Sequence, residues 1–260
     1  MSVAPAAIAL VRAVSPRLAE CELMQLERVP IDASRAIRQH RSYVHTLGEL
    51  GARVEWLPEL TEHPDGVFVE DTAVVLPGLA VITRPGALSR QAEVESTAQA
   101  LARYRRLRRI EPPGSLDGGD VLAIGRTLYV GLSARTNRAG VEQLERAVAP
   151  EGYAVRPLPL TGCLHLKSAV ASVSGGRILI NPHWVDAGAF AAFDSITVDD
   201  AEPAAANVLT VGGTTLVSSR YPRTAQRLRS AGVEIRVLEV DELHKAEAGL
   251  TCMSLIVQAA

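Results

Sequence analysis

The sequence predicts an α/β protein in which about five similar units close into a propeller-like ring. Three observations favour this fold: a hairpin pattern recurs along the chain, helical segments and further strands lie between the hairpins, and the last hairpin lacks its second strand. Recurrence at roughly 40–50 residues is typical of solenoids and propellers. An ordinary mixed α/β sheet, with chance similarity among its hairpins, is the alternative.

Each predicted hairpin consists of a polar residue, an apolar strand, a turn containing glycine and a second apolar strand. Such segments begin at Asp71, Asp120, Lys167 and Asn207. The run that begins at Cys252 supplies only the first strand of a hairpin. The N-terminal strand Ile8–Arg12 is the candidate for the missing partner, and this pairing would close the ring.

Apolar residues recur at helical spacing in Ala33–Leu50, Arg90–Arg103, Asn137–Val148 and Thr224–Ser230. These helices lead to the predicted strands Val54–Leu57, Arg109–Glu111, Ala154–Leu158 and Ile235–Leu238. The basic cluster from Arg103 to Arg109 is interpreted as a solvated helix end followed by a strand. A polyanion-binding patch is the alternative.

Length, charge and cysteine content exclude several classes. The 260 residues, with a formal net charge of −2, are expected to form one catalytic domain, residues 1–260, without a nucleic-acid or membrane partner. No run of 18 apolar residues is present, and Met1–Val14 resembles a first strand rather than a signal peptide. Three widely spaced cysteines indicate a reducing, cytoplasmic setting. The oligomeric state is left open between a monomer and a homodimer.

The repeat predicts where functional side chains meet. The starts of the first hairpin strands share one register, so in a ring they converge near the axis together with the loops that precede them. The residues concerned are Asp65, Glu70, Asp71, Asp117, Asp120, His165, Lys167, Asn207 and Cys252. The ring is therefore expected to bring a thiol, an imidazole and several carboxylates into one cavity.

These residue types suit nucleophilic catalysis on a cationic carbon. A Cys252 thiolate is a candidate nucleophile, and His165 can protonate a leaving amine and later activate water. Asp117 can hold the imidazole in the useful tautomer. Several carboxylates without a metal repel one another unless they meet a cation, so a guanidinium is a natural ligand for Asp71. The alternative for Cys252 is a buried structural thiol, and a zinc site has poor ligand spacing.

Five segments of the chain resemble signature segments of the dimethylarginine dimethylaminohydrolase family, and they occur in the family order. They are Pro64-Asp65-Gly66-Val67-Phe68-Val69-Glu70-Asp71, Leu116-Asp117-Gly118-Gly119-Asp120, Gly131-Leu132-Ser133-Ala134-Arg135-Thr136-Asn137, Leu164-His165-Leu166-Lys167-Ser168 and Leu250-Thr251-Cys252. This family belongs to the guanidine-modifying superfamily, so the resemblance implies a five-bladed α/β propeller, the pentein fold.

The resemblance also implies an activity that needs no cofactor and no metal. Cys252 would attack the guanidinium carbon of an Nω-methylated arginine, His165 would protonate the departing amine, and water would release citrulline from a covalent intermediate. The implied catalytic residues are Cys252, His165 and Asp117. The implied substrate-binding residues are Asp71 and Glu70 at the guanidine, Asp65 at the α-amino group, Arg90 and Arg135 at the carboxylate, and Leu23 in a covering flap.

Two other functions remain as alternatives. The first is hydrolysis of arginine or another substituted guanidine. Arginine deiminases typically carry His-x-Asp, whereas this chain has His165-Leu166-Lys167, which favours an N-methylated substrate. The second is a protein without catalytic activity that senses methylarginine or binds a partner. The presence of Cys252, His165 and Asp117 together argues against this second alternative.

Overall fold

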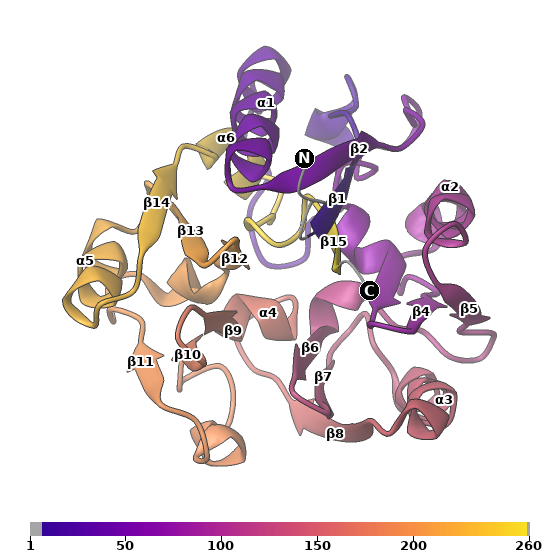
Figure 1. Cartoon of the computed structure of the whole chain (residues 1–260). Helices are drawn as coiled ribbons and strands as arrows, with labels where there is room; N and C mark the ends of the chain where they lie inside the picture. Colours follow the sequence, from indigo (N-terminus) through magenta and orange to yellow (C-terminus); the bar gives the residue numbers. More distant parts are fainter. Residues whose placement is uncertain (1–6, 259–260) are drawn as a thin grey trace, which may run out of the picture.

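The structure, a computed structural model, describes residues 7–258, in which the strands form five three-stranded sheets grouped around a common centre (Figure 1). Every sheet has the same topology: a central strand pairs antiparallel with one neighbour and parallel with the other. The chain is thus a mixed α/β protein of several small sheets. Residues 1–6, part of the segment expected to form the first strand, lie outside the described range.

The sheets are composed as follows, with the central strand in the middle. They are β15 (Leu255–Gln258), β1 (Ala7–Val11) and β2 (Ala52–Trp56); β3 (Ala73–Val75), β4 (Leu79–Ile82) and β5 (Arg106–Arg109); β6 (Val121–Ile124), β7 (Thr127–Leu132) and β8 (Ala154–Pro159); β9 (Val170–Val173), β10 (Arg177–Ile180) and β11 (Ser195–Thr197); and β12 (Leu209–Val211), β13 (Thr214–Ser218) and β14 (Ile235–Leu238).

The two ends of the described chain share one sheet. Strand β1 pairs antiparallel with β15, with Leu10 opposite Leu255, and parallel with β2. Both leucines are at most 5% exposed, so the pairing buries matching apolar side chains. The expected pairing of the N-terminal strand with the half-hairpin after Cys252 is confirmed.

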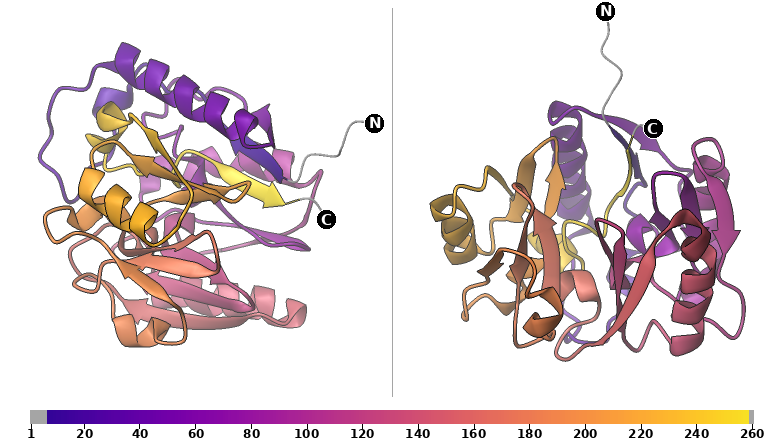
Figure 2. Two further views of the ribbon diagram at one scale, coloured as in Figure 1. Left: turned by 60° about the vertical axis from the view of Figure 1, so that its left-hand side comes forward. Right: turned by 60° about the horizontal axis from the view of Figure 1, so that its bottom comes forward.

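The helices are α1 (Ala33–Glu49), α2 (Val94–Leu101), α3 (Arg138–Val148), α4 (Leu166–Ala169), α5 (Pro222–Ser230) and α6 (Asp241–His244), with 3₁₀ turns η1 (Leu18–Glu20), η2 (Val69–Thr72), η3 (Leu88–Glu93), η4 (Gly118–Asp120), η5 (Ala149–Glu151), η6 (Ala187–Phe190) and η7 (Pro203–Ala206). Helices α1, α2, α3 and α5 lie on the outside of the sheets (Figure 2). Helix α3 begins as predicted, because the Asn137 side chain accepts a hydrogen bond from Gly140 N at 2.8 Å.

The structure departs from the predicted repeat in three places. The hairpin expected from Lys167 begins at Val170, because Leu166–Ala169 forms helix α4. The helix expected from Arg90 begins at Val94, because Leu88–Glu93 forms a 3₁₀ turn in which Arg90 and Glu93 are buried and bonded to each other. The unit between β10 and β11 has only the short turn η6 in place of a helix. Its third strand, β11, is only three residues long, and the sequence pattern did not indicate it.

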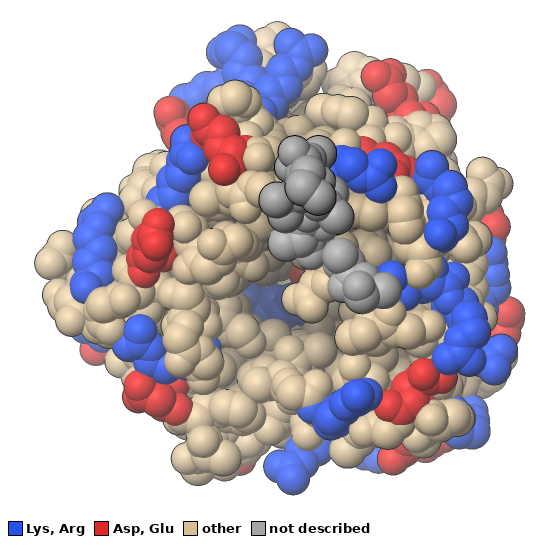
Figure 3. Space-filling view, in the orientation of Figure 1, with Lys and Arg blue, Asp and Glu red and all other residues tan. Residues whose placement is uncertain are grey.

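The basic cluster lies between the end of helix α2 and the end of the edge strand β5, in agreement with the interpretation as a helix end followed by a strand. Strand β5 begins at Arg106, three residues before the predicted start, and two of its three arginines pair with acids of neighbouring elements. Arg106 binds Glu151 at 2.7 Å and Arg109 binds Glu95 at 2.6 Å, while Arg103 pairs with Glu55. Basic and acidic side chains are accordingly interspersed on the face in Figure 3.

Apolar side chains fill the spaces between neighbouring sheets and beneath the outer helices. Near the centre, a cavity of about 260 Å³ lies between the first strands of the sheets and reaches Glu70 and Lys167, and Figure 3 shows the surface hollowed there. The turns just before these strands, η2 and η4 among them, contact one another. Across residues 7–258, none of the helices has the length and apolar character that crossing a bilayer requires.

Candidate active site

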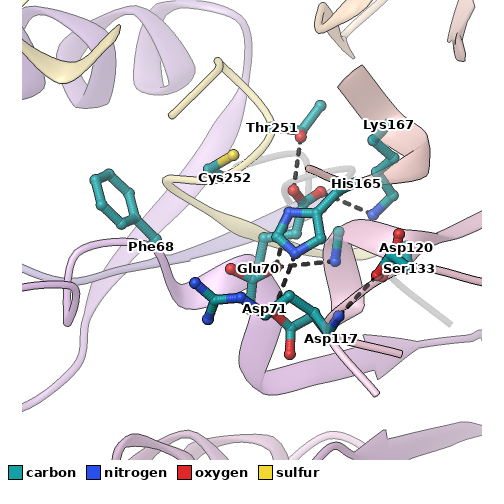
Figure 4. Close-up of polar contacts among 12 residues, drawn as sticks. Phe68, Glu70, Asp71, Asp117, Asp120, Ser133, His165, Lys167, Thr251 and Cys252 are labelled. Carbon is teal, nitrogen blue, oxygen red and sulfur yellow. Dashed lines mark hydrogen bonds and ion pairs between the residues drawn. The ribbon is translucent and has the colours of Figure 1, made fainter. Parts of the chain in front are cut away.

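A buried imidazole and two buried carboxylates meet where the turns converge. His165 Nε2 lies 3.0 Å from Asp117 Oδ2, and His165 Nδ1 lies 3.9 Å from Asp71 Oδ1 (Figure 4). All three side chains are at most 7% exposed. Asp117 Oδ1 also accepts a hydrogen bond from Gly86 N at 2.8 Å, so the carboxylate is fixed on one side while the imidazole binds the other.

Two consecutive glycines allow this close approach. A Cβ atom on Gly118 would lie 2.0 Å from the carbonyl oxygen of Glu70, and one on Gly119 would lie 2.8 Å from both Asp71 Oδ1 and His165 Nδ1. Without these atoms, Gly119 N can donate to Asp71 Oδ1 at 3.0 Å. The motif Asp117-Gly118-Gly119 therefore places a carboxylate and a hydrogen-bond donor in a space that no side chain can share.

The local charges favour a protonated His165. Burial alone would lower the pKa of His165, but Asp71, Asp117 and Asp120 together raise it to about 10. Burial opposes the charge of Asp71 as well, yet His165 and Arg90 hold the pKa of Asp71 down at about 2. At neutral pH the site thus contains an imidazolium between carboxylates, a group that can donate a proton.

Cys252 lies in the loop that leads into β15 and is 8% exposed. Its Sγ accepts a weak hydrogen bond from Gly249 N at 3.3 Å. Burial, followed by the negative charges of Glu70 and Asp71, raises the pKa of the Cys252 thiol. The thiol is therefore neutral in the free protein, and a cation placed beside it would favour the thiolate.

Glu70 contacts the backbone of Cys252, and its carboxylate binds two neighbouring side chains. Its carboxylate accepts from Lys167 Nζ at 2.7 Å and from Thr251 Oγ1 at 2.6 Å, and Glu70 N donates to Cys252 O at 3.1 Å. The resemblance placed Glu70 at the guanidine. In the structure Glu70 does not line the cavity that contains Cys252; it supports the loop and neutralises Lys167.

Arg90 binds acids inside the protein in this structure. Its Nη1 donates to Asp71 Oδ2 at 2.6 Å, and its Nη2 donates to Glu93 at 2.9 Å and to Phe68 O at 2.9 Å. The family resemblance implied that Arg90 holds a substrate carboxylate. It lines the cavity, but its guanidinium is paired with Asp71, because both groups are buried and need a counter-charge.

Asp65 and Arg135 also line this cavity. Asp65 Oδ2 accepts from Glu22 N at 3.1 Å, and burial raises the pKa of Asp65 to about 6. Arg135 Nε lies 3.1 Å from the Met24 sulfur. Both residues therefore contact the segment 19–29 that was predicted as a flap.

One carboxylate binds three consecutive backbone N–H groups of the flap. Glu247 accepts hydrogen bonds from the backbone N–H groups of Met24, Gln25 and Leu26. Glu247 has a φ of 58°, a backbone conformation that few residues other than glycine adopt. Leu23 differs from the expectation: it packs against the apolar core, and Glu22 is the flap residue that lines the cavity.

The cavity itself is small. It has a volume of about 20 Å³ and is lined by Glu22, Asp65, Phe68, Asp71, Arg90, Arg135, Leu164, His165, Ala246, Glu247, Ala248 and Cys252. This volume has room for about one water molecule, so an amino acid can enter only when the flap or the side chains around the cavity move.

The site also meets a geometric criterion for metal binding. Within residues 7–258, Asp71, Asp117 and His165 form the one group of potential ligands whose atoms lie within 4.8 Å of one another. Metal coordination requires a neutral imidazole, whereas the pKa of His165 is raised to about 10 by the surrounding carboxylates, burial opposing the shift. Asp71 already accepts from Arg90 and Gly119. These contacts favour an ion-pair network over a metal centre.

Three further residues of the site were not indicated by the sequence. Glu93 fixes Arg90, and Glu247 fixes the flap. Arg12, fully buried, donates to Gly66 O at 2.6 Å in the Asp65–Asp71 loop. The spacing Arg90-x-x-Glu93 could have indicated an (i, i+3) ion pair. Arg12 and Glu247 have no such local signal, because only the fold brings them to the site.

Comparisons with known proteins agree with this arrangement. No protein-family model matches the chain. The N(G),N(G)-dimethylarginine dimethylaminohydrolase of Streptomyces coelicolor is 40% identical over 96% of this chain and 97% of its own length. The enzyme of the same name from Pseudomonas aeruginosa is 32% identical over 86% of this chain and 89% of its own.

A solved structure extends the likeness to three dimensions. The Pseudomonas aeruginosa enzyme, crystallised as a cysteine-to-serine mutant with citrulline, superposes with a TM-score of 0.90 at 29% identity, over 95% of this chain and 98% of its own. The family expected from the five motifs is thereby confirmed, and the chain belongs to the dimethylarginine dimethylaminohydrolase family.

Proposed function

We propose that the protein hydrolyses Nω-methylated arginine to citrulline and methylamine or dimethylamine through a covalent intermediate on Cys252. The observation that carries the proposal is the imidazolium of His165, held between Asp117 and Asp71, in the same cavity as the Cys252 thiol. Relatives named for this reaction cover nearly the whole chain. The substrate is a small molecule, and the mechanism uses only side chains of this protein.

Substrate binding activates the nucleophile. The guanidinium binds Asp71, and Arg90 gives up part of its contact with this carboxylate to hold the substrate carboxylate together with Arg135. Asp65 binds the α-amino group. Because burial and neighbouring negative charges raise the pKa of the Cys252 thiol, the arriving cation lowers it again, and the thiol proton passes to solvent.

The first chemical step forms the C–S bond and breaks the C–N bond. The Cys252 thiolate attacks the guanidinium carbon, and His165 Nδ1 donates its proton to the departing nitrogen, which takes the bonding electron pair and leaves as a neutral amine. Pairing of Asp71 with the substrate weakens the field that raises the pKa of His165, so the imidazolium becomes a stronger acid at this step. A thiouronium remains on Cys252.

The second step restores the protein. Neutral His165 accepts a proton from water as the water oxygen attacks the same carbon. The C–S bond then breaks as the second proton of the attacking water passes to the leaving sulfur. Citrulline leaves as a neutral molecule, and Cys252 returns as a thiol beside protonated His165. Asp117 holds Nε2 throughout, so that Nδ1 is the nitrogen that gives and takes the proton.

The test is to incubate the purified protein with asymmetric dimethylarginine and a chelator and to measure citrulline. Citrulline formation that depends on Cys252 supports the proposal, and its absence from a folded protein rejects it. Arginine in the same assay tests the alternative, which is hydrolysis of arginine itself. Arginine deiminases carry a second acid where this chain has Lys167, which pairs with Glu70.

Three broader expectations accompany this function. We propose that the five sheets form a closed five-bladed propeller, supported by their common topology and by the pairing of β1 with β15. We also propose that residues 1–260 act as one catalytic domain. The cysteines Cys21, Cys163 and Cys252 are unpaired, which supports a reducing, cytoplasmic location.

A further inference from the structure

A second, larger cavity adjoins the site on the side of His165 and Cys252. This cavity, here called the side pocket, has a volume of about 330 Å³, and its lining includes Leu26, Leu164, Trp184, Ala204, Tyr221 and Ala248. It lies between the end of the flap and turn η7. Leu164, Glu247 and Ala248 line both the side pocket and the site cavity, so these residues form the wall between them.

The wall lies next to His165 and Cys252. Leu164 immediately precedes His165, and Ala248 immediately precedes Gly249, whose N–H donates to Cys252 Sγ. The charged groups Asp65, Arg90 and Arg135 line the site cavity but not the side pocket. A substrate that places its amino-acid end at these charges and its leaving nitrogen at His165 therefore directs the substituents of that nitrogen toward Leu164 and Ala248.

The side pocket suits an alkyl group and a neutral amine. His244 lines it with both ring nitrogens bonded, to Ala248 O at 2.8 Å and Ser218 Oγ at 2.7 Å, and burial lowers the pKa of His244 to about 4, so it stays uncharged. The Glu247 carboxylate is bonded to the N–H groups of the flap. Arg220, exposed at the edge, disfavours an ammonium ion.

We propose that the side pocket receives the part of a nitrogen substituent that extends beyond a methyl group, so that the enzyme accepts Nω-alkyl arginines with substituents longer than methyl. This inference rests on the proposed function. The site cavity, at about 20 Å³, has room for about one water molecule, whereas the side pocket, at about 330 Å³, is more than ten times larger. The extra room is on the leaving-group side, and Leu164 is the side chain that an alkyl chain must pass.

The experiment compares Nω-methyl-, ethyl-, propyl- and butylarginine with dimethylarginine, using citrulline release as the readout. We expect kcat/KM for propylarginine to stay within about tenfold of the methyl compound, with KM falling by up to about fourfold for each added methylene that is buried. A loss of more than about a hundredfold from methyl to propyl, with dimethylarginine still hydrolysed, overturns the inference.

Variants at Ala204 test whether the alkyl group lies in the side pocket. Ala204 is partly buried and lines the side pocket but not the site cavity. Ala204→Phe should lower kcat/KM for propylarginine at least about tenfold and leave dimethylarginine within about twofold. Ala204→Val should have a smaller effect of the same kind and serves if the larger substitution prevents folding. Ala192→Phe, at an exposed alanine, is the matched control and should change neither.

The outcomes separate the two proposals. If the Ala204 variants lower the turnover of every compound equally, the side pocket does not receive the substituent and the inference is wrong. If the wild-type protein hydrolyses no compound of the series, including dimethylarginine, the proposed function fails and the inference fails with it. If the wild-type protein hydrolyses dimethylarginine but not the longer alkylarginines, the inference is wrong and the proposed function stands.

Discussion

Replacing Asp117 with asparagine tests how the site controls its proton donor. The amide introduced by Asp117→Asn keeps an oxygen for Gly86 N, which now donates to Asp117 Oδ1 at 2.8 Å. The other side of the amide then presents N–H groups to His165 Nε2, where Asp117 Oδ2 accepts at 3.0 Å. The imidazolium then loses its acceptor at Nε2, so the neutral ring is favoured. Its one proton lies on Nδ1, and Nδ1 therefore cannot accept a proton from water.

The magnitude follows from the role of the imidazole. General acid–base catalysis by a positioned side chain contributes about 10²–10⁴-fold to a rate, which corresponds to about 3–5 kcal/mol of barrier. We expect kcat for dimethylarginine to fall by about this factor in Asp117→Asn. Substrate KM should change much less, because Asp117 does not line the cavity.

The pH profile gives a second, independent readout. Carboxylates, acting against burial, raise the pKa of His165 to about 10, so the wild-type protein keeps the acid form through the neutral range. Removing one negative charge lowers this pKa, and the alkaline limb of kcat/KM should therefore move to lower pH. The assay measures citrulline from about pH 6 to about pH 10, a range that spans the titration of an imidazole raised in this way. Asp200→Asn, at an exposed aspartate, is the matched control.

Two results would refute this reasoning. The first is a kcat within about threefold of the wild type in a folded Asp117→Asn protein. The second is a large loss of kcat with an unchanged alkaline limb, since that pattern would mean that Asp117 does not act through the charge of His165.

Four further predictions address other parts of the site. Cys252→Ser should abolish citrulline release while calorimetry still detects substrate binding; residual turnover above about one-thousandth would contradict the role of the thiol. Lys167→Met leaves buried Glu70 without its cation and should lower the free energy of unfolding by about 1–3 kcal/mol and reduce turnover at neutral pH. Lys245→Met removes one of the two cations that pair with buried Glu242, the other being Arg35, and should affect denaturant midpoints alone. Glu247→Gln weakens the hold on the flap, so amide exchange at Met24–Leu26 should accelerate at least about tenfold; unchanged exchange would show that another contact holds the flap. Gly118→Ala places a Cβ atom 2.0 Å from Glu70 O and should prevent stable folding, while Gly48→Ala, in helix α1 with open space around it, should stabilise by about 0.5–1 kcal/mol.

The repeat made much of the fold predictable. The hairpins at Asp71, Asp120 and Asn207 follow a local pattern of alternation and glycine turns, and the structure contains each of them. The pairing of the two chain ends followed from one unfinished hairpin. Strand β11 gave no comparable signal, because its three residues, Ser195–Thr197, are largely exposed and lack a periodic pattern.

The meeting of the site's side chains was predictable because they lie at, or just before, equivalent positions of the repeat. The convergence of Asp71, Asp117 and His165 followed from the repeat, and the structure places their ligand atoms within 4.8 Å. The partner of each side chain was harder to predict. Arg90 binds Asp71 and Glu93, because buried charges pair with the nearest acid, and this depends on the 3₁₀ turn η3 rather than on the sequence motif.

Contacts between distant segments escaped prediction. Glu247 binds backbone N–H groups of residues more than 200 positions away, and main-chain donors leave no mark in a sequence. Leu23 was expected over the substrate because the flap has few anchoring motifs, and the structure turns it toward the core while Glu22 lines the cavity. A shift of one residue in an irregular loop is enough to exchange these positions.

The most direct test of the proposed mechanism is the mass of the protein quenched during turnover. Dimethylarginine and monomethylarginine should give the same adduct on Cys252, with the mass of the substrate less that of its own departing amine, because both lose their methyl groups before water attacks. Peptide mapping should locate it on Cys252 and leave Cys21 and Cys163 unmodified. Turnover with adducts that retain the methyl groups, or with an adduct on another residue, would contradict the account.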